Sequence, residues 1–429
     1  MRKIILILTA IAAIFLILVY LSVSETDDRF RTCEVQDIED MDNIRFRDFD
    51  SVTVAANTLY EASLLKELMQ GEQYRDAWAM PITVPIVFLD TLKGGLKVIE
   101  QGGGKQTHSL ELEDGLGIRY TLRSLSKDPA KLVPDIAKDL GLENIVIDGV
   151  SAQHPYAALV VAKLSESAEI LHTRPRLLFV PKQKVLGDFN DKFGNRLYFF
   201  EYESEGKVDW TGHGKAIGLL DTKDLQKMKM DEGRKLSIDL NALIRARLFD
   251  LVIGDWDRHA KQWGWTIQGN EEGYTAIPVP TDRDNAFFNQ DGILPTLIAN
   301  DLTLPKVQAY EKEIEFLPGL VRTFDEYFLR TSSSAQFKSE AIRLRKQLND
   351  HEIEKAFKAW PSAIDSLDGP EIRRKLKARR EALITYAEEF YKILNERPMQ
   401  PIVLKGSEEL ELSDNLLNCF DCMGPAPKN

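Results

Sequence analysis

One stretch constrains the fold more than any other, because it joins an apolar helix directly to a cluster of charges. Residues 236–253 carry apolar side chains at helical spacing, which is the pattern of a helix buried in a core. The next six residues read G-D-W-D-R-H. They bring four ionisable side chains together within five positions: Asp255, Asp257, Arg258 and His259. Because buried charges need partners, the chain must fold in a way that supplies them.

A second acidic loop follows the first along the chain. The segment Tyr274–Phe288 begins as a strand and continues into T-D-R-D-N-A-F-F, in which Asp282 and Asp284 lie two apart. Two acidic loops joined by a hairpin are typical of phosphoryl transfer, in which one carboxylate orients or deprotonates the acceptor hydroxyl and the other binds divalent ions. A packing-only interpretation stays open. In it, Arg258 pairs with a carboxylate to hold its loop, and the core takes Trp256, Trp263 and Trp265.

The predicted elements place strands before helices. Apolar residues at helical spacing predict a first helix from about Ser51 to Glu72. Short alternating segments and a D-G-L-G turn then predict strands, as in Pro81–Leu89 and Arg196–Glu203, with one buried helix over Pro155–Glu169. Tyr310–Arg397 is almost entirely helical by pattern. This order predicts an α+β protein with a strand-rich unit before a larger helical unit.

The spacing of the acidic loops resembles that of atypical kinases with a D-R-H catalytic loop. These include the type II phosphatidylinositol 4-kinases, the secretory-pathway casein and sugar kinases and, more loosely, the HipA toxin kinases. The resemblance implies a two-lobed protein-kinase-like fold, with a strand-rich N-lobe and a helical C-lobe. It also implies that Asp257 is the catalytic base and that Arg258 and His259 orient the loop.

The same resemblance implies ligands for Mg²⁺ or Mn²⁺. Asp282 is followed five residues later by Phe287, as in the second motif of these kinases, so Asp282 is the expected metal ligand. The other expected ligand position is Gln262, where these kinases usually have Asn or Glu. Asp284 is either a second ligand or a salt-bridge partner of Arg283.

A glycine-rich segment between two predicted strands is the candidate loop for covering the phosphates of ATP. It reads G-G-G-K-Q-T and contributes Gly102, Gly103, Gly104 and Lys105. Glycines let backbone amides approach phosphate closely. A flexible hairpin tip is the alternative interpretation.

The kinase pattern expects a lysine on the following strand, but Arg123 occupies that position. An arginine can also bind phosphate through its forked guanidinium, and Lys105 and Lys127 are alternatives. No glutamate is evident at the start of the helix that would carry the acidic partner. The strand between the lobes is expected to place three residues beside adenine: Glu201, Tyr202 and Glu203.

The N-terminus predicts a membrane segment. Arg2 and Lys3 precede the uncharged, apolar run Ile4–Val23, and about 20 apolar residues are needed to cross a bilayer as a helix. The basic flank is expected to stay cytoplasmic, which places the rest of the chain on the periplasmic or extracellular side. A cleaved signal peptide is the alternative.

Charge and cysteine content restrict the partners. The net charge of −12 argues against a nucleic-acid partner, because the phosphate backbone needs a basic surface. Cys33 stands alone, and Cys419 and Cys422 form a C-F-D-C near the C-terminus. This pair is interpreted as half a zinc site, a redox pair or a local disulfide.

The chain from about Tyr60 also resembles a family of exported bacterial proteins that has no established activity. The resemblance rests on the strings Y-R-D-A-W, G-G-G-K-Q-T, L-R-S-L-S-K-D-P, Q-H-P-Y-A-A-L and G-D-W-D-R-H. We expect five parts: a membrane anchor or signal segment (1–24), a linker (25–50), the N-lobe (51–205), the C-lobe (206–398) and a tail (399–429).

The sequence thus predicts a membrane-anchored, exported kinase that moves the γ-phosphoryl of ATP to a hydroxyl of a protein, sugar or lipid in the cell envelope. ATP is scarce outside the cytoplasm, so another activated phosphate donor is an alternative. A catalytically inactive protein that binds a nucleotide or an envelope ligand is a second hypothesis. The third is a metal-dependent hydrolase built on Asp255, Asp257, His259 and Asp282.

Overall fold

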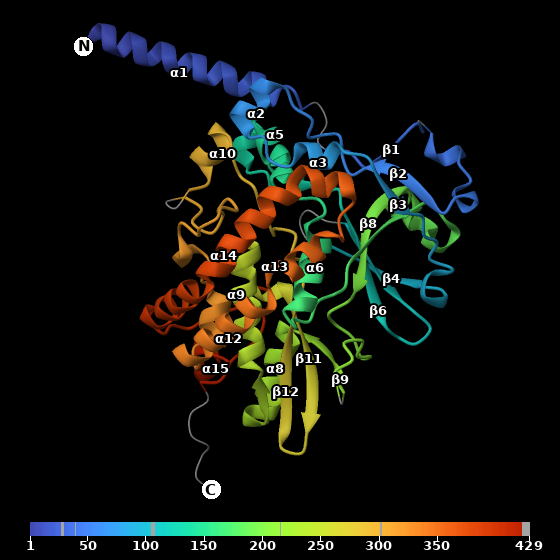
Figure 1. Cartoon of the computed structure of the whole chain (residues 1–429), viewed down its shortest axis with the longest axis vertical. Coiled ribbons are helices and arrows are strands. Elements are labelled where there is room, and N and C mark those ends of the chain that lie inside the picture. The colour runs from blue at the N-terminus through green and yellow to red at the C-terminus, as the bar shows by residue number, and fades with distance from the viewer. Residues whose placement is uncertain (27–29, 39, 104–107, 215, 301–302, 423–429) are drawn as a thin grey trace.

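The computed structural model describes residues 1–26, 30–38, 40–103, 108–214, 216–300 and 303–422. The predicted glycine-loop residues Gly104 and Lys105 lie outside these ranges. The chain is a mixed α+β protein, as the order of elements predicts. Two of its three sheets are built from the first half of the chain, and helices dominate the second half (Figure 1).

A five-stranded antiparallel sheet forms the centre of the first half. Its strands, in spatial order, are β4 (Lys97–Gly102), β5 (Ser109–Glu113), β6 (Arg119–Ser124), β8 (Arg196–Tyr202) and β7 (Arg176–Val180). The D-G-L-G turn joins β5 to β6, and the Asp114 carboxylate accepts hydrogen bonds from the backbone N–H groups of Leu116 and Ile118. The buried helix α6 (Ala157–Ser167) comes between β6 and β7 in the chain, close to the predicted Pro155–Glu169.

A three-stranded sheet lies beside β7 and corrects one prediction. It consists of β1 (Glu34–Val35), β2 (Ser51–Ala55) and β3 (Ile82–Pro85). The helix expected from Ser51 to Glu72 is wrong over its first part, because only α2 (Leu64–Gln70) is helical. In β2, Val52 and Val54 are buried, so the two-residue period of a strand prevails there over the helical spacing of the leucines.

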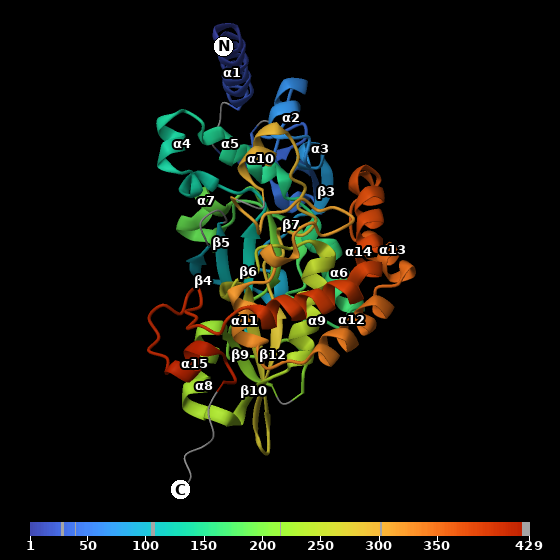
Figure 2. The same ribbon diagram turned by 90° about the vertical axis from the view of Figure 1, so that its left-hand side faces the viewer.

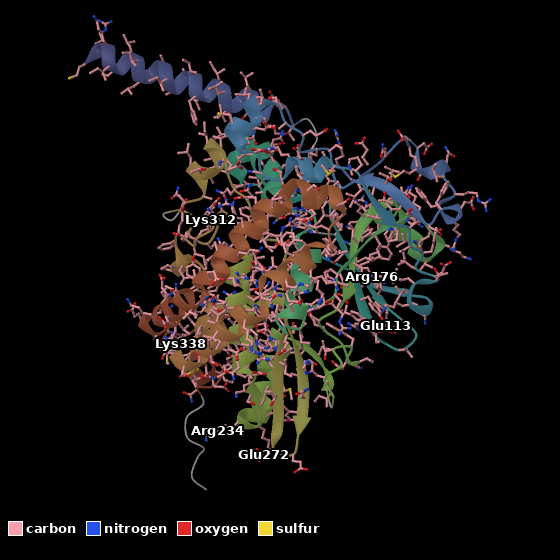
Figure 3. All side chains as sticks on the ribbon, in the orientation of Figure 1. Glu113, Arg176, Arg234, Glu272, Lys312 and Lys338 are labelled. Atoms are coloured by element: carbon pink, nitrogen blue, oxygen red, sulfur yellow. A yellow bond between two sulfur atoms is a disulfide. The ribbon has the colours of Figure 1, made fainter. Side chains whose placement is uncertain are left out.

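The second half begins with helix α9 and a four-stranded sheet. The sheet order is β10 (Leu236–Ile238), β12 (Gly273–Pro280), β11 (Trp263–Asn270) and β9 (Ala216–Asp221). The single helix predicted over residues 236–253 is therefore a short strand followed by α9 (Leu240–Ile253), which Asp239 caps at its N-terminus. The β11–β12 hairpin projects from the body with Glu272 at its tip (Figure 3).

Helices complete the second half. The longest is α14 (Ser362–Glu396), which packs against α9 and α12. The other helices are α3 (Arg75–Ala79), α4 (Asp135–Asp139), α5 (Glu143–Asp148), α7 (Asn190–Phe193), α8 (Thr222–Glu232), α10 (Ile293–Ile298), α11 (Thr323–Phe328), α12 (Ser334–Gln347), α13 (Asp350–Phe357) and α15 (Asp414–Asn418).

The N-terminal apolar run forms one long helix, α1 (Arg2–Val23), which extends away from the body (Figure 1). It is the one straight helix among the described residues that is long and apolar enough to cross a membrane, and the bent pair formed by residues 143–152 and 157–167 passes the same test only as a broken span. A helix of this kind near an N-terminus is either a membrane span or a signal sequence.

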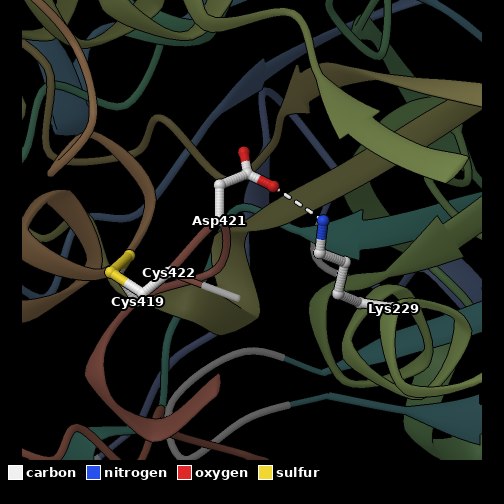
Figure 4. Close-up of a disulfide and its surroundings, with 4 residues drawn as sticks. All are labelled: Lys229, Cys419, Asp421 and Cys422. Atoms are coloured by element: carbon white, nitrogen blue, oxygen red, sulfur yellow. Dashed lines mark hydrogen bonds and ion pairs between the residues drawn. A yellow bond between two sulfur atoms is a disulfide. The ribbon is translucent and has the colours of Figure 1, made fainter. Parts of the chain in front are cut away.

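The C-F-D-C of the tail has its two sulfurs bonded, so the local-disulfide interpretation holds (Figure 4). Asp421 lies between the two cysteines, and its carboxylate contacts the Lys229 ammonium at 2.7 Å. Phe420 is fully buried against Phe328. The disulfide thus closes a short loop that packs onto the helical half.

Candidate functional site

A buried carboxylate at the end of α9 binds three arginines. The Asp250 carboxylate forms ion pairs with the guanidinium groups of Arg247 at 2.8 Å, Arg258 at 3.2 Å and Arg283 at 3.0 Å. Burial raises the pKa of a carboxyl group, but the three positive charges outweigh it and hold the pKa of Asp250 below its ordinary value. Arg247 also contacts the buried Asp325 at 2.6 Å. This cluster is closed to solvent.

The cluster joins the two acidic loops, because Arg258 belongs to D-R-H and Arg283 belongs to D-R-D. Arg258 also donates a hydrogen bond to the carbonyl oxygen of Thr281 at 2.8 Å, and the N–H of Thr281 donates to the carbonyl of Gln262 at 3.0 Å. The loops are therefore held side by side. In each motif the arginine is buried and the preceding aspartate stays partly open, with 24% of the Asp257 side chain and 44% of the Asp282 side chain exposed.

Asp257 lies beside one cation that the sequence did not indicate. The Lys306 ammonium is 3.5 Å from its carboxylate and stands over the ring of Trp256. The nearest imidazole nitrogen of His259 is 3.9 Å from the other carboxylate oxygen. Burial lowers the pKa of His259 to about 4, so this ring is neutral near pH 7. The low pKa makes His259 a weak base, and its ring borders the Asp257 carboxylate.

Arg123 connects the five-stranded sheet to the D-R-D loop. Its guanidinium is 2.9 Å from Asp282 and also contacts Asp284, while its Nε donates to Glu201 at 2.8 Å. In the β6–β8 register, Arg123 lies opposite Phe199, and Thr121 lies opposite Glu201. Since side chains alternate between the two faces of a strand, Arg123 and Glu201 share one face, so the acidic partner comes from β8.

The expected partner on the helix is absent from the described contacts of Arg123. Glu166 of α6 is exposed and pairs with Lys163 instead. Because the sheet already fixes both backbones, pairing with a glutamate on the neighbouring strand requires no further ordering of the main chain.

Asp284 is the most strongly neutralised carboxylate of the loop. Arg123 contacts one of its carboxylate oxygens, and the Lys127 ammonium contacts the other at 2.8 Å. Burial raises the pKa of Asp284, but Arg123 and Lys127 outweigh this and hold it well below the ordinary value. Partial desolvation by the surrounding protein and the nearby Asp284 charge together raise the pKa of Asp282, although 44% of its side chain is open to solvent. The salt bridge between Asp284 and Arg283 proposed from the sequence is wrong, because the Arg283 guanidinium lies on Asp250.

The D-R-D-N-A-F loop is held in a strained conformation. Asp282 and Phe287 both have positive φ, at 50° and 61°, which is uncommon for residues other than glycine and an outlier for a bulky ring. The Phe287 N–H donates to the carbonyl of Ile253, and the Tyr74 hydroxyl donates to the Phe287 carbonyl at 2.5 Å. Strained residues held by surrounding contacts gather at functional sites.

The remaining predicted residues lie on the sheet and in the first loop. Gly102 pairs with Ser109, which pairs with Arg123, so the start of the glycine loop and Arg123 lie in one row across the sheet. Gly103 follows with a φ of 116°. The Gln262 side-chain oxygen accepts from the His259 N–H at 3.4 Å, which uses it to cap the loop.

The two other residues predicted beside adenine are packed at the end of β8. The ring of Tyr202 stacks on Trp210. Glu203 accepts from the hydroxyl of Thr121 and from the N–H of Ser204 at 2.8 Å, and burial raises its pKa. Both side chains are thus engaged by other residues of the protein.

The donor atoms fit a hard divalent ion that takes most of its ligands from elsewhere. In the described part of the chain, no three His, Cys, Asp or Glu residues form a group that could hold a metal ion. Asp282 and Asp284 nevertheless offer carboxylate oxygens on one side of Arg123. Mg²⁺ in nucleotide sites is commonly bound by one or two carboxylates together with phosphates and waters.

Sequence analysis missed Asp250 and Lys306. Asp250 carried a usable signal, because it lies with Arg245 and Arg247 in a buried stretch of α9 whose other residues are apolar. Such a residue needs a partner in the core. Lys306 carried none, since it follows α10 in a segment without regular pattern and reaches Asp257 only through the fold.

Comparisons with known proteins give little more. No protein-family model matches the chain, and no curated protein matches it. Among solved structures, it is similar to the Helicobacter pylori proinflammatory kinase CtkA, at 14% identity over 69% of this chain and 95% of that one, with a TM-score of 0.36. It is also similar to a chain of the Shewanella oneidensis MR-1 toxin–antitoxin complex of HipA, HipB and operator DNA, at 12% identity over 69% and 67%, with a TM-score of 0.34. Similarities this low carry no argument about activity, so function has to be argued from the site.

Proposed function

We propose that this chain is a membrane-anchored, exported phosphotransferase with a two-lobed, kinase-like fold. It transfers the γ-phosphoryl of ATP, or of another activated phosphate donor, to a hydroxyl of a protein, sugar or lipid in the cell envelope. The contact of Arg123 with both Asp282 and Asp284 carries the proposal. Through this contact, the sheet with its glycine loop meets the acidic loop to which the D-R-H loop is bound.

The phosphate-binding role falls to the cations on the sheet side. Arg123 and Lys127 both lie at Asp284, and the row that contains Gly102 leads from the glycine loop to Arg123. A guanidinium can bind two phosphate oxygens at once, and an ammonium acts as a point charge. Phosphates entering between them would compete with carboxylates that these cations already bind.

The role of general base, which accepts the proton of the substrate hydroxyl, falls to Asp257. Its carboxylate is partly exposed and accepts the proton of an incoming hydroxyl as that oxygen attacks phosphorus. Lys306, 3.5 Å away, places a positive charge where the transferred group gains negative charge. Arg258 fixes the loop through Asp250 and Thr281 without facing the reactants.

A divalent ion, Mg²⁺ or Mn²⁺, would be held by Asp282, with Asp284 as the second carboxylate. When bound, such an ion bridges phosphate oxygens and neutralises charge that develops during transfer. Asp282 is the better-placed ligand, because its side chain is the more exposed of the two.

A second candidate function is binding without turnover. The observation that favours it is the neutralisation of the cleft groups by one another: Arg123 already binds three carboxylates, and Lys127 already binds Asp284. A cleft whose cations are already paired with carboxylates can bind a nucleotide or an envelope ligand without catalysing phosphoryl transfer.

Turnover by the full-length chain in lipid nanodiscs tests the proposal. With labelled ATP and Mg²⁺ or Mn²⁺, Asp257→Asn should lose about 10²–10⁴-fold in phosphoryl transfer and keep nucleotide binding. The matched control is Asp231→Asn, which removes a carboxylate from the exposed side of α8. Equal absence of autophosphorylation, ATP hydrolysis and nucleotide binding in wild type and Asp257→Asn would end the kinase proposal, whereas binding without product would support the second candidate.

A further inference from the structure

The body shows a group of exposed apolar side chains where α1 leaves it. They come from three short helices, and each contributes a pair four residues apart, which places the pair on one side of its helix. The pairs are Leu64 and Leu68 of α2, Ile136 and Leu140 of α4 and its C-cap, and Ile293 and Leu297 of α10. We call these six residues the membrane-proximal face. Figure 2 shows α2, α4, α5 and α10 gathered below the end of α1.

These helices pack around the last turns of α1. Val19 and Val23 are buried in a small core with Met69 and Leu294, and Leu142 borders it. The Tyr20 hydroxyl donates to the carbonyl of Leu140 at 3.0 Å. The turn after α4 therefore lies level with the last turns of α1.

Polar contacts fix this junction. The buried Lys66 ammonium contacts the hydroxyl of Thr26 at 2.7 Å and the carboxylate of Asp148 at 2.9 Å. The side-chain amide of Gln70 donates to the hydroxyl of Ser22 at 3.2 Å. The end of α1 is thus part of the folded body, so the position of α1 in a bilayer determines the position of the body.

The length of α1 brings the face to the bilayer. Its 22 residues extend about 33 Å at 1.5 Å per residue, close to the hydrocarbon thickness of about 30 Å. The part before Val19 has 17 residues, or about 25 Å, and is too short by itself. To span the bilayer, the turns packed against the body must lie within the membrane boundary as well.

Exposure on this face is high for apolar residues. Leu64 is 86% exposed, Ile136 is 70% exposed and Leu297 is 61% exposed. The charged groups of α4 are Asp135, Lys138 and Asp139, and α10 has none. A surface that mixes apolar side chains with a few charges fits the boundary between lipid headgroups and acyl chains.

We propose that the membrane-proximal face rests in the headgroup–acyl boundary of the bilayer that α1 crosses, so the body is held on the membrane surface at a fixed orientation. The inference rests on the membrane anchor of the proposed function and adds a second contact with the lipid. It commits to lipid as the occupant, because the face surrounds the exit of a helix that itself belongs in lipid.

Depth-dependent quenching of the full-length chain tests the face. Single cysteines are introduced as Ile136→Cys and Leu297→Cys, labelled with an environment-sensitive fluorophore and reconstituted in phosphatidylcholine and phosphatidylglycerol vesicles, with or without bromine on the acyl chains. Ile342→Cys is the matched control, because Ile342 is an exposed apolar residue of α12. Ile11→Cys reports the anchor itself. The unsubstituted chain gives the labelling blank, since Cys33 is buried and the other cysteines are disulfide-bonded.

The expected result is a loss of fluorescence in brominated vesicles at positions 11, 136 and 297, and none at 342. If position 11 is quenched but positions 136 and 297 are quenched no more than position 342, the membrane-proximal face does not contact lipid, although α1 still spans the bilayer. If position 11 is not quenched, α1 does not lie in the bilayer, and the membrane-anchored part of the proposed function is wrong. This outcome is independent of the result of the kinase assay. An unchanged thermal unfolding midpoint shows that the substitutions leave the body folded.

Discussion

Two ionic clusters of arginines and carboxylates contact the acidic loops, and they differ in access to solvent. Around Asp250, three arginines and a second aspartate are fully buried. Around Arg123, three carboxylates and Lys127 form a second cluster in which Asp282 stays partly exposed. The first cluster can only hold the fold, whereas the second can exchange a partner for a ligand. Composition alone does not separate the two roles, but burial does.

The difference also divides each motif internally. In D-R-H and in D-R-D, the arginine turns to Asp250 and the aspartate before it turns to the open side. Neighbouring residues therefore serve opposite purposes, one fixing the loop and the other facing a reactant. Substitution of the buried Asp250 should therefore lower stability, whereas substitution of the partly exposed Asp257 should lower activity.

The largest expected effect follows from Asp250→Ala. The substitution leaves three buried guanidinium groups without their shared carboxylate, and breaking a buried pair in this way costs about 3–5 kcal/mol. Urea unfolding should show this loss, and the comparison variant Asp257→Asn should stay within about 1 kcal/mol of wild type because its side chain is partly exposed. Equal stability of the two variants would contradict the division into a structural and a functional cluster.

A smaller effect is expected from Arg123→Ala, measured as nucleotide affinity. Hydrogen bonds to charged groups contribute about 1.5–3 kcal/mol, so binding should weaken by roughly 10- to 100-fold. Arg123→Lys should restore part of it, since the charge returns without the fork. Arg176→Ala is the matched control, because Arg176 is an exposed arginine of β7 in the same sheet (Figure 3). Unchanged binding in Arg123→Ala by calorimetry would show that the open cluster does not bind phosphate.

The smallest expected effect concerns His172, which lines a pocket with Arg123, Glu201 and Asp282. Burial lowers its pKa to about 4, against the opposing effect of Glu166 at 3.7 Å and with a further lowering by Arg283 and Arg174. In the unfolded chain the His172 imidazole binds a proton near pH 6.5, whereas in the folded chain it does so only near pH 4. The free energy of unfolding should therefore fall as the pH drops through this window, with a slope of at most about 1.4 kcal/mol per pH unit for this one ring.

Urea unfolding at several pH values measures this slope, and His172→Gln should flatten it. His351→Gln is the control, because His351 lies exposed on α13. If the free energy of unfolding of His172→Gln depends on pH as steeply as that of wild type, groups other than His172 cause the pH dependence.

Local pattern was sufficient for strongly periodic elements and insufficient where two periods overlap. The helix over α6 and the strand β8 follow from runs of apolar residues with clear ends. Over β2, leucines further along the chain imitated helical spacing, and the alternation of Val52 and Val54 was the competing signal. At β10, an apolar stripe continued across a strand–helix boundary that is marked only by the capping residue Asp239.

The sequence by itself determined the apolar N-terminal helix, the mainly helical end of the chain and the two acidic loops. These depend on side chains close together in the chain, whose spacing records which face is buried. Only the tertiary structure decided the partners: Glu201 for Arg123, Lys127 for Asp284, Lys306 for Asp257, and Asp250 for both loop arginines. The physical reason is that an ionic contact depends on distance and burial, and most of these pairs join residues that are far apart in sequence and meet only when sheet and helices pack together.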